Sequence, residues 1–189
     1  MATVIVANDL VGVGKVALTS SLPIMSACQT EVLPLPTVLL SSHTGEFENI
    51  YMRDLTDDLK GFYKQWEHLD FTVDGLVSGY FKSREELKIV GQLARDKQIA
   101  LFVDPIMGDN GRLYQGFDME YVEAMKDFCQ QADAIIPNLT EAALLTDTTY
   151  LEAGSYDEAT IEKLLRELTK LGPRKVILTG ISFETEKIG

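Results

Sequence analysis

The stretch TVIVANDLVGVGK, residues 3–15, opens with an apolar run and passes through Asn8-Asp9 into a segment rich in glycine. A run that is apolar on both faces is typical of a parallel strand covered by helices on each side. We therefore predict a strand over Thr3–Ala7 that ends at Asn8-Asp9. Glycines after such a strand permit a tight turn into the following helix. The stretch indicates an α/β fold.

The same stretch comes close to a phosphate-binding P-loop, G-x-x-x-x-G-K-[ST]. Aligning Gly14-Lys15 on the GK of this pattern places Asp9 at the first glycine and Val16 at the hydroxyl that holds Mg²⁺. A carboxylate at the first position would repel phosphate, and valine cannot ligate a metal ion. We therefore reject the P-loop and interpret Gly12 and Gly14 as parts of a strand-to-helix turn.

Apolar runs alternate with amphipathic segments along the rest of the chain, which predicts a doubly wound, mostly parallel α/β sheet flanked by helices on both faces. The remaining predicted strands are Val32–Leu40 (interrupted by Pro34 and Pro36), Gly75–Val77, Ile99–Val103, Ala134–Ile136 and Val176–Leu178. A capping box at Ser83–Glu86 predicts a helix that runs to about Lys97. Three further helices are predicted from apolar stripes: Leu55, Leu59, Phe62, Trp66 and Leu69; Met119, Val122, Met125 and Cys129; and Ile161, Leu164, Leu165, Leu168 and Leu171.

Composition limits the partners that the chain can have. A length of 189 residues favours one domain, 1–189. The net charge of -12 argues against general binding to nucleic acid or to an anionic membrane surface. The sequence shows no secretory leader and no apolar run that could span a bilayer, which predicts a cytoplasmic protein. Cys28 and Cys129 form no C-x-x-C pattern, so neither a zinc site nor a disulfide framework is indicated.

Polar side chains follow the predicted strands, and ligands of open α/β sheets bind beyond the carboxyl ends of strands. VDPIMGDNG places Asp104 and Asp109 around one such end, and PNLTE places Asn138 and Glu141 at the next. These oxygen ligands suit Mg²⁺ that enters with substrate phosphates.

Three ring-bearing residues are further candidates. His43, in SSHTG (41–45), could bond a flat polar ring, act as a base or be a buried structural histidine. Tyr80 and Tyr114 could stack on such a ring or belong to the core.

Six motifs resemble, in this order, those of the pyridoxal, pyridoxine and pyridoxamine kinases in the ribokinase-like superfamily: ANDLVGVGK, LPTVLLSSHTG, VSGY, VDPIMGDNGRLY, PNLTEA and VILTG. The resemblance implies transfer of a phosphoryl group from ATP to the 5′-hydroxymethyl group of a vitamin B6 vitamer. It also implies Mg²⁺ on the phosphates, often a monovalent cation such as K⁺, and a homodimer. The glycines of VGVGK would then belong to the acceptor-substrate turn, with ATP bound elsewhere.

The resemblance implies a vitamin site over the N-terminal half of the sheet and an ATP site over the C-terminal half. One departure concerns Val11, where many relatives carry serine, so a hydroxyl contact to the substrate would be missing. The preferred vitamer, or a related pyrimidine, therefore stays open. The implied vitamin residues are Asp9, His43, Thr44, Gly79, Tyr80 and Tyr114, and the implied ATP residues are Asp104, Asp109, Asn138, Glu141 and Thr179, with Asp104, Asp109 and Glu141 near the metal.

Two alternative functions remain: a hydroxymethylpyrimidine kinase, and a non-catalytic protein that binds B6 or a nucleotide. Relatives place a general-base Asp in a G-[TA]-G-D motif at a helix N-terminus, and this motif is absent from the 189 residues. The catalytic residue is therefore unassigned. We expect a ribokinase-like domain that is incomplete at its C-terminal side, has negligible activity and exposes apolar surface.

Overall fold

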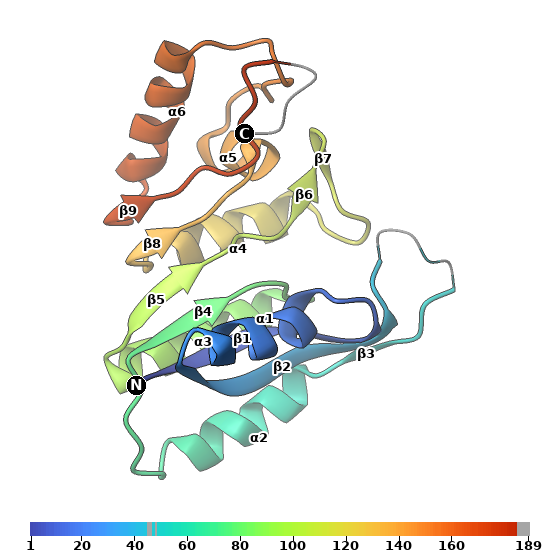
Figure 1. Cartoon of the computed structure of the whole chain (residues 1–189), viewed down its shortest axis with the longest axis vertical. Coiled ribbons are helices and arrows are strands. Elements are labelled where there is room, and N and C mark those ends of the chain that lie inside the picture. The colour runs from blue at the N-terminus through green and yellow to red at the C-terminus, as the bar shows by residue number, and fades with distance from the viewer. Residues whose placement is uncertain (45–46, 48, 185–189) are drawn as a thin grey trace. The chain divides into compact units, whose positions relative to one another are not determined.

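The computed structural model describes residues 1–44, 47 and 49–184, and it forms two compact units, Met1–Leu101 and Phe102–Gly189 (Figure 1). Gly45 of the SSHTG motif and residues 185–189 lie outside the described residues. Each unit holds mainly parallel strands with helices packed on them, as predicted.

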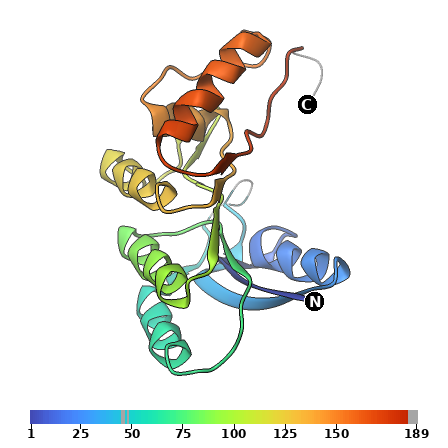
Figure 2. The ribbon, with the colours of Figure 1, turned by 90° about the vertical axis from the view of Figure 1, so that its left-hand side faces the viewer.

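The first unit contains four strands in the order β3-β2-β1-β4. Strand β1 pairs in parallel with β2 and β4, whereas β3 runs antiparallel to β2. Helix α1 covers one face of these strands, and α2 and α3 cover the other (Figure 2). The bounds are β1 Ala2–Val13, α1 Ala17–Ala27, β2 Thr30–Ser42, β3 Met52–Asp54, α2 Thr56–Trp66, β4 Gly75–Ser78 and α3 Arg84–Lys97.

The second unit contains the parallel strands β5, β8 and β9, in this order, and a separate antiparallel hairpin of β6 and β7. The ladder continues past β9, since the amides of Ile177 and Thr179 both donate to main-chain carbonyls at 2.9 Å. The bounds are β5 Ala100–Val103, β6 Gly108–Asp109, β7 Arg112–Leu113, α4 Met119–Cys129, β8 Ala134–Ile135, α5 Leu139–Thr146, α6 Glu158–Lys170 and β9 Lys175–Val176.

Side-chain caps begin the helices that carry the site. The capping box predicted at Ser83 is confirmed: the Glu86 amide donates to Ser83 Oγ at 3.2 Å, and the Glu86 carboxylate accepts from the Ser83 amide at 3.2 Å. A second capping box opens α5, where Asn138 and Glu141 exchange the same pair of bonds. Such caps satisfy amides that would otherwise be unpaired in the first helical turn.

The predicted end of the first strand at Asn8-Asp9 is wrong. The register of β1 against β2 shifts between Asn8 and Leu10, and β1 then continues to Val13, which pairs with Ser42. Such a bulge accommodates an extra residue while the ladder goes on. The strand continues because Val11 finds an apolar place beside Val38 and Leu40 of β2.

The prolines of the second predicted strand do not interrupt it. Pro34 and Pro36 lie inside β2, opposite Val6 and Asn8 of β1. Proline cannot donate to a ladder on both sides, so it is tolerated where one side of a strand lacks a partner. In the described part of the chain, β3 pairs with β2 only at 38–40, beyond both prolines.

The helical stripes hold for most positions. Val122, Met125 and Cys129 of α4 are fully buried, and Ile161, Leu164 and Leu168 of α6 are also buried, whereas Leu165 and Leu171 are half-buried. Met119, Phe62 and Leu69 are exposed instead, with Met119 at the first residue of its helix and Leu69 beyond the end of α2. Helix α1 is the helix expected after the turn at Gly14, whereas the sequence patterns give no signal for α5, β3 or the β6–β7 hairpin. None of the helices within residues 1–44, 47 and 49–184 has the length and apolar character to cross a membrane.

Candidate functional site

The Asn8 side chain organises the predicted vitamin residues of the first unit. Asn8 Oδ1 accepts hydrogen bonds from the amides of Tyr80, at 2.8 Å, and Asp9, at 2.9 Å. Gly79 lies against this side chain, and any Cβ at Gly79 would overlap the Asn8 amide group. The bulge of β1 is therefore joined to the end of β4 at a point where only glycine fits.

The amide, the carbonyl and the side chain of Tyr80 each have a contact that fixes its position. Its carbonyl accepts from the buried Thr37 Oγ1 at 2.7 Å, and its side chain packs on the cluster of Val11, Val38 and Leu40. Burial raises the pKa of Tyr80 to about 12, and the charge of Asp9 adds to this shift. Tyr80 thus stays a neutral donor close to the Asp9 carboxyl.

Asp9 is a buried carboxyl in the bulge, with 8% of its surface exposed. Burial raises its pKa to about 6, although a hydrogen bond from its own backbone amide opposes the shift. A carboxyl of this kind exchanges its proton close to neutral pH and can accept or donate a hydrogen bond there. Val11, by contrast, is buried in the cluster under Tyr80, so its side chain supplies packing at this position.

His43 and the two glycines of VGVGK pack the ends of β1 and β2 together. The His43 amide donates to the Val13 carbonyl at 3.2 Å, and the imidazole lies over Gly14, where a Cβ would come within 2.7 Å of Cδ2. Gly14 also has a φ of 122°, which L-residues rarely adopt. A Cβ at Gly12 would come within 2.8 Å of the Ser41 carbonyl oxygen. Packing therefore accounts for both glycines, and Gly12 lies within a strand rather than in a phosphate-binding loop.

Thr44 follows His43 and is exposed. The His43 ring also meets Phe47 edge to face, with centroids 4.9 Å apart. The structure thus brings Asp9, Gly79 and Tyr80 together through Asn8, and it places His43 and Thr44 where β2 ends.

In the second unit, Glu141 is the most buried of the predicted ATP-site carboxyls, with 3% of its surface exposed. Its two oxygens accept from the amides of Asn138, at 2.8 Å, and Met107, at 3.3 Å. Burial raises the pKa of Glu141 to about 8, and the charges of Asp104 and Asp109 raise it further. Glu141 therefore carries a proton at neutral pH unless a cation offsets the surrounding negative charge.

Asp104 is half-buried, and burial raises its pKa to about 6. Asp109 is exposed on β6 and accepts from the amide and the side chain of Asn110, at 2.8 and 3.1 Å. Within the described part of the chain, no three His, Cys, Asp or Glu side chains are grouped to hold a metal ion. The charges of Asp104 and Asp109 raise the pKa of Glu141, but in the described residues the three carboxyls do not form a ready-made ligand set.

Tyr114 and Thr179 complete the predicted positions. Tyr114 follows β7, and burial together with the charges of Asp109, Glu141 and Asp104 raises its pKa. The described structure thus places Tyr114 near the acidic residues of its own unit. Thr179 is exposed, and its hydroxyl donates to the Pro137 carbonyl at 3.3 Å.

Sequence reasoning missed the residues that hold these groups in place. Thr37 and Thr140 are buried and bond to main-chain atoms of Tyr80 and Gly111, and Asn8 had been noted only as a polar strand end. The signal for Thr37 was a hydroxyl inside an apolar run, since a buried hydroxyl requires a partner.

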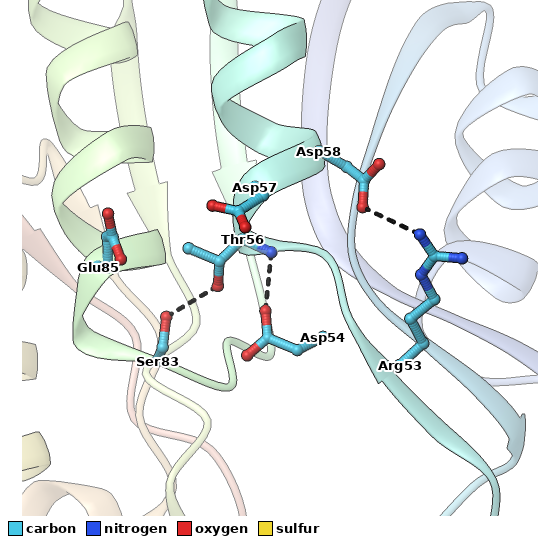
Figure 3. Close-up of a pocket in the computed structure, with 7 residues that line it drawn as sticks. All are labelled: Arg53, Asp54, Thr56, Asp57, Asp58, Ser83 and Glu85. Carbon is cyan, nitrogen blue, oxygen red and sulfur yellow. Dashed lines mark hydrogen bonds and ion pairs between the residues drawn. The ribbon is translucent and has the colours of Figure 1, made fainter.

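A depression of about 440 Å³ in the first unit lies away from these residues, at the first turns of α2 and α3 (Figure 3). Its polar groups contact one another: Thr56 Oγ1 and Ser83 Oγ are 3.1 Å apart, and the Thr56 amide donates to Asp54 at 2.8 Å. Ser83 caps α3, and ion pairs account for the charged side chains: Arg53 pairs with Asp58, and Lys60 pairs with Asp57 and Glu85. The lining residues are Arg53, Asp54, Thr56, Asp57, Asp58, Ser83 and Glu85.

The mainly parallel strands, the covering helices and the six motifs place the chain among the ribokinase-like kinases. The model of the phosphomethylpyrimidine kinase family matches residues 53–188, and the chain belongs to this family. Because this family and the similar solved structures are kinases, the chain belongs to a family of phosphotransferases.

Solved structures confirm the resemblance to pyridoxal kinases. Pyridoxal kinase from Lactobacillus plantarum is 36% identical, with a TM-score of 0.91, and the match covers 100% of this chain and 67% of that one. The "putative phosphomethylpyrimidine kinase" from Bacteroides thetaiotaomicron, in a crystal form with pyridoxal, is also 36% identical, with a TM-score of 0.89, and the match covers 95% of this chain and 63% of that one.

A protein of Saccharomyces cerevisiae, "Putative pyridoxal kinase BUD17", is 32% identical over 120 residues, which are 59% of this chain and 37% of the yeast protein. The chain thus spans about two thirds of these solved relatives, and its match covers just over a third of the yeast protein.

Proposed function

We propose that the chain forms the major part of a kinase that transfers the γ-phosphoryl group of MgATP to the 5′-hydroxymethyl group of pyridoxal, pyridoxine or pyridoxamine. The observation that carries this proposal is the 36% identity, along the whole chain, to the pyridoxal kinase of Lactobacillus plantarum. Pyridoxal in the equally similar Bacteroides protein supports the choice of a B6 vitamer.

The proposed vitamin site uses the side chains that Asn8 and Thr37 arrange. Asp9, with a pKa of about 6, would exchange a hydrogen bond with a polar atom of the pyridine ring. Tyr80, which packs on the cluster of Val11, Val38 and Leu40, would lie against the ring. His43 and Thr44, at the end of β2, would supply further polar contacts, and Gly79 leaves room for them.

The proposed ATP site uses Asp104, Asp109 and Glu141, with Asn138 and Thr179 beside them. Their chemistry fits a divalent cation, because Glu141 is desolvated and has two acidic neighbours that raise its pKa. Mg²⁺ would neutralise charge on the phosphates during transfer. Tyr114 would lie close to this charge and contact the bound substrate.

A hydroxymethylpyrimidine kinase is the second candidate, and the family match at residues 53–188 favours it. Its substrate is also a flat ring with a hydroxymethyl group. Val11 offers no hydroxyl at a position where many pyridoxal kinases carry serine, so a hydroxyl contact that would select a B6 vitamer would be missing. A protein that binds B6 or a nucleotide without turnover is the third candidate.

Calorimetric titrations of the chain with pyridoxal, hydroxymethylpyrimidine and MgATP separate these candidates when combined with product assays. We expect pyridoxal to bind more tightly than the pyrimidine. The reverse order would favour the pyrimidine kinase. Binding of both ligands without product, even in a longer chain that includes a G-[TA]-G-D segment, would favour the non-catalytic candidate.

The general base is a separate question, since residues 1–189 contain no G-[TA]-G-D motif. We expect pyridoxal phosphate formation by these residues to be slower than by the longer chain by a factor of about 10² or more, the usual contribution of a general base. Comparable rates would place the base within residues 1–189. The homodimer, the single domain, the monovalent cation and the cytoplasmic location stay predictions.

A further inference from the structure

The β6–β7 hairpin carries two of the proposed site residues on very little structure of its own. Two residue pairs join its strands, Gly108 with Leu113 and Asp109 with Arg112, and just beyond them the Tyr114 amide donates to the Met107 carbonyl at 3.0 Å. Its turn is Asn110-Gly111, with φ of 50° and 73°. A two-stranded hairpin is at best marginally stable by itself in water. The positions of Asp109 and of Tyr114, which follows β7, therefore depend on what holds the hairpin.

Two side chains at the start of α5, those of Asn138 and Thr140, hold the hairpin in place. Thr140 Oγ1 accepts from the Gly111 amide at 2.9 Å, and Asn138 Nδ2 donates to the Gly108 carbonyl at 2.9 Å. The methyl group of Thr140 lies so near Gly108 that a Cβ there would be 3.2 Å from it. The Thr140 side chain thus lies against both the turn and the first strand of the hairpin.

The hydroxyl of Thr140 is not needed by its own helix. Asn138 caps α5, and Glu141 returns the second bond of the capping box. Thr140 is nevertheless buried, with 3% of its surface exposed, and it bonds a residue 29 positions away in the sequence. Burying a hydroxyl without a partner is unfavourable, so the bond to Gly111 determines where the turn can lie.

We propose that Thr140 is a positioning residue: it fixes the Asn110-Gly111 turn and, through it, sets Asp109 and Tyr114 beside Glu141. The functional part rests on the proposed function, because it assigns Asp109 and Tyr114 to the site that receives the phosphates and their divalent cation. The geometric part is independent of it. The same helical turn then presents Glu141 and aligns the hairpin that faces it.

Amide hydrogen exchange at Gly111, followed by NMR, tests the geometric part. In the unmodified chain and in Thr140→Ser, which keeps the hydroxyl, we expect protection. In Thr140→Val, which keeps the shape but loses the acceptor, exchange should be about tenfold faster. Thr146→Val is the matched control, since the Thr146 hydroxyl bonds its own helix at the Ala142 carbonyl. It should leave Gly111 unchanged.

Titration with MgATP tests the functional part. Thr140→Val should weaken binding about three- to tenfold, whereas Thr140→Ser and Thr146→Val stay within about twofold. An unprotected Gly111 amide in the unmodified chain would overturn the proposal even if Thr140→Val did not fold. Unchanged exchange and affinity in Thr140→Val would also overturn it. If the unmodified chain did not bind MgATP at all, the proposed function would fail, while the exchange at Gly111 would still decide the role of Thr140.

Discussion

Glu141 combines two roles that are usually separate. It completes a capping box for α5, and it is a buried carboxyl with a pKa of about 8 that has Asp104 and Asp109 as neighbours. Its carboxylate accepts hydrogen bonds from the backbone amides of Asn138 and Met107. Capping requires acceptor oxygens, whereas binding a cation requires the charge, so a substitution can separate the two.

Glu141→Gln should weaken Mg²⁺-dependent nucleotide binding by about tenfold or more and leave pyridoxal binding within about twofold. Glutamine keeps the shape but removes the charge that stabilises the cation. Titration of the folded variant with MgATP and with pyridoxal measures both effects. Glu162→Gln, an exposed position paired with Arg166, serves as the control. Intact MgATP affinity with lost vitamin affinity would reverse the assignment of the two sites.

Lys15→Ala should change MgATP affinity by less than about twofold. A P-loop lysine contacts the β- and γ-phosphates, but Lys15 is exposed and follows glycines whose places are explained by strand packing. Titration with MgATP, together with a thermal unfolding curve, measures this. A large, selective loss of affinity in a variant that stays folded would restore the P-loop.

At the scale of elements, the close approach of β1 to β2 depends on a glycine. Gly12→Ala would place a Cβ within 2.8 Å of the Ser41 carbonyl oxygen, and backbone atoms on both strands limit relaxation. We expect a destabilisation of about 1–3 kcal/mol in urea unfolding. Gly61→Ala is the matched control: its Cβ meets nothing within 4 Å in α2, so it should stabilise by about 0.5–1 kcal/mol. Equal effects of the two would contradict the packing account.

Local patterns were enough to locate the elements whose stability is local. The apolar runs predicted β4, β5 and β8, and the capping box predicted the start of α3. The full length of β1 was missed because it depends on partners in β2 from Leu39 to Ser42. A helix is expected after the turn at Gly14, but its bounds do not follow from the sequence, since α1 contains Pro23. The β6–β7 hairpin has two residues per strand, so no periodic pattern can reveal it.

The candidate site also contains residues that local sequence patterns predict and residues that they do not predict. Residues at strand ends could be named from the sequence, because strand ends follow from apolar runs. The residues that hold them could not: Asn8, Thr37 and Thr140 bond to backbone atoms at 72, 43 and 29 positions along the chain. Such bonds depend on the folded register, and residue type alone does not encode that register.

At the scale of the whole molecule, four carboxyls, three of them buried and one half-buried, have pKa values that are shifted in the same direction. The pKa is raised to about 6 for Asp9 and Asp104, to about 7 for Glu86 and to about 8 for Glu141, with burial as the main cause. Between about pH 4 and these values, the folded chain holds protons that the unfolded chain has released. Stability therefore falls as pH rises through this range. The net charge of -12 acts in the same direction.

We expect the free energy of unfolding to be lower at pH 8.5 than at pH 6, by on the order of 2 kcal/mol. Urea unfolding at a series of pH values measures this dependence. Glu141→Gln, which cannot titrate, should flatten the upper part of the curve, whereas Glu162→Gln should not. Stability that is constant or rises over this interval would show that these carboxyls are ionised in the folded chain.

The hydrogen bonds of Asn138 and Thr140 to the β6–β7 hairpin also affect how this protein can be produced. Asn138-Leu139-Thr140 spells an acceptor sequence for N-linked glycans. In the folded chain Asn138 Nδ2, the atom that a sugar would join, donates to Gly108, and the Thr140 hydroxyl accepts from Gly111. Glycosylation in a secretory host would require these two hydrogen bonds to be broken. A glycan at Asn138 would therefore mark molecules modified before this unit had folded, and mass spectrometry would count them.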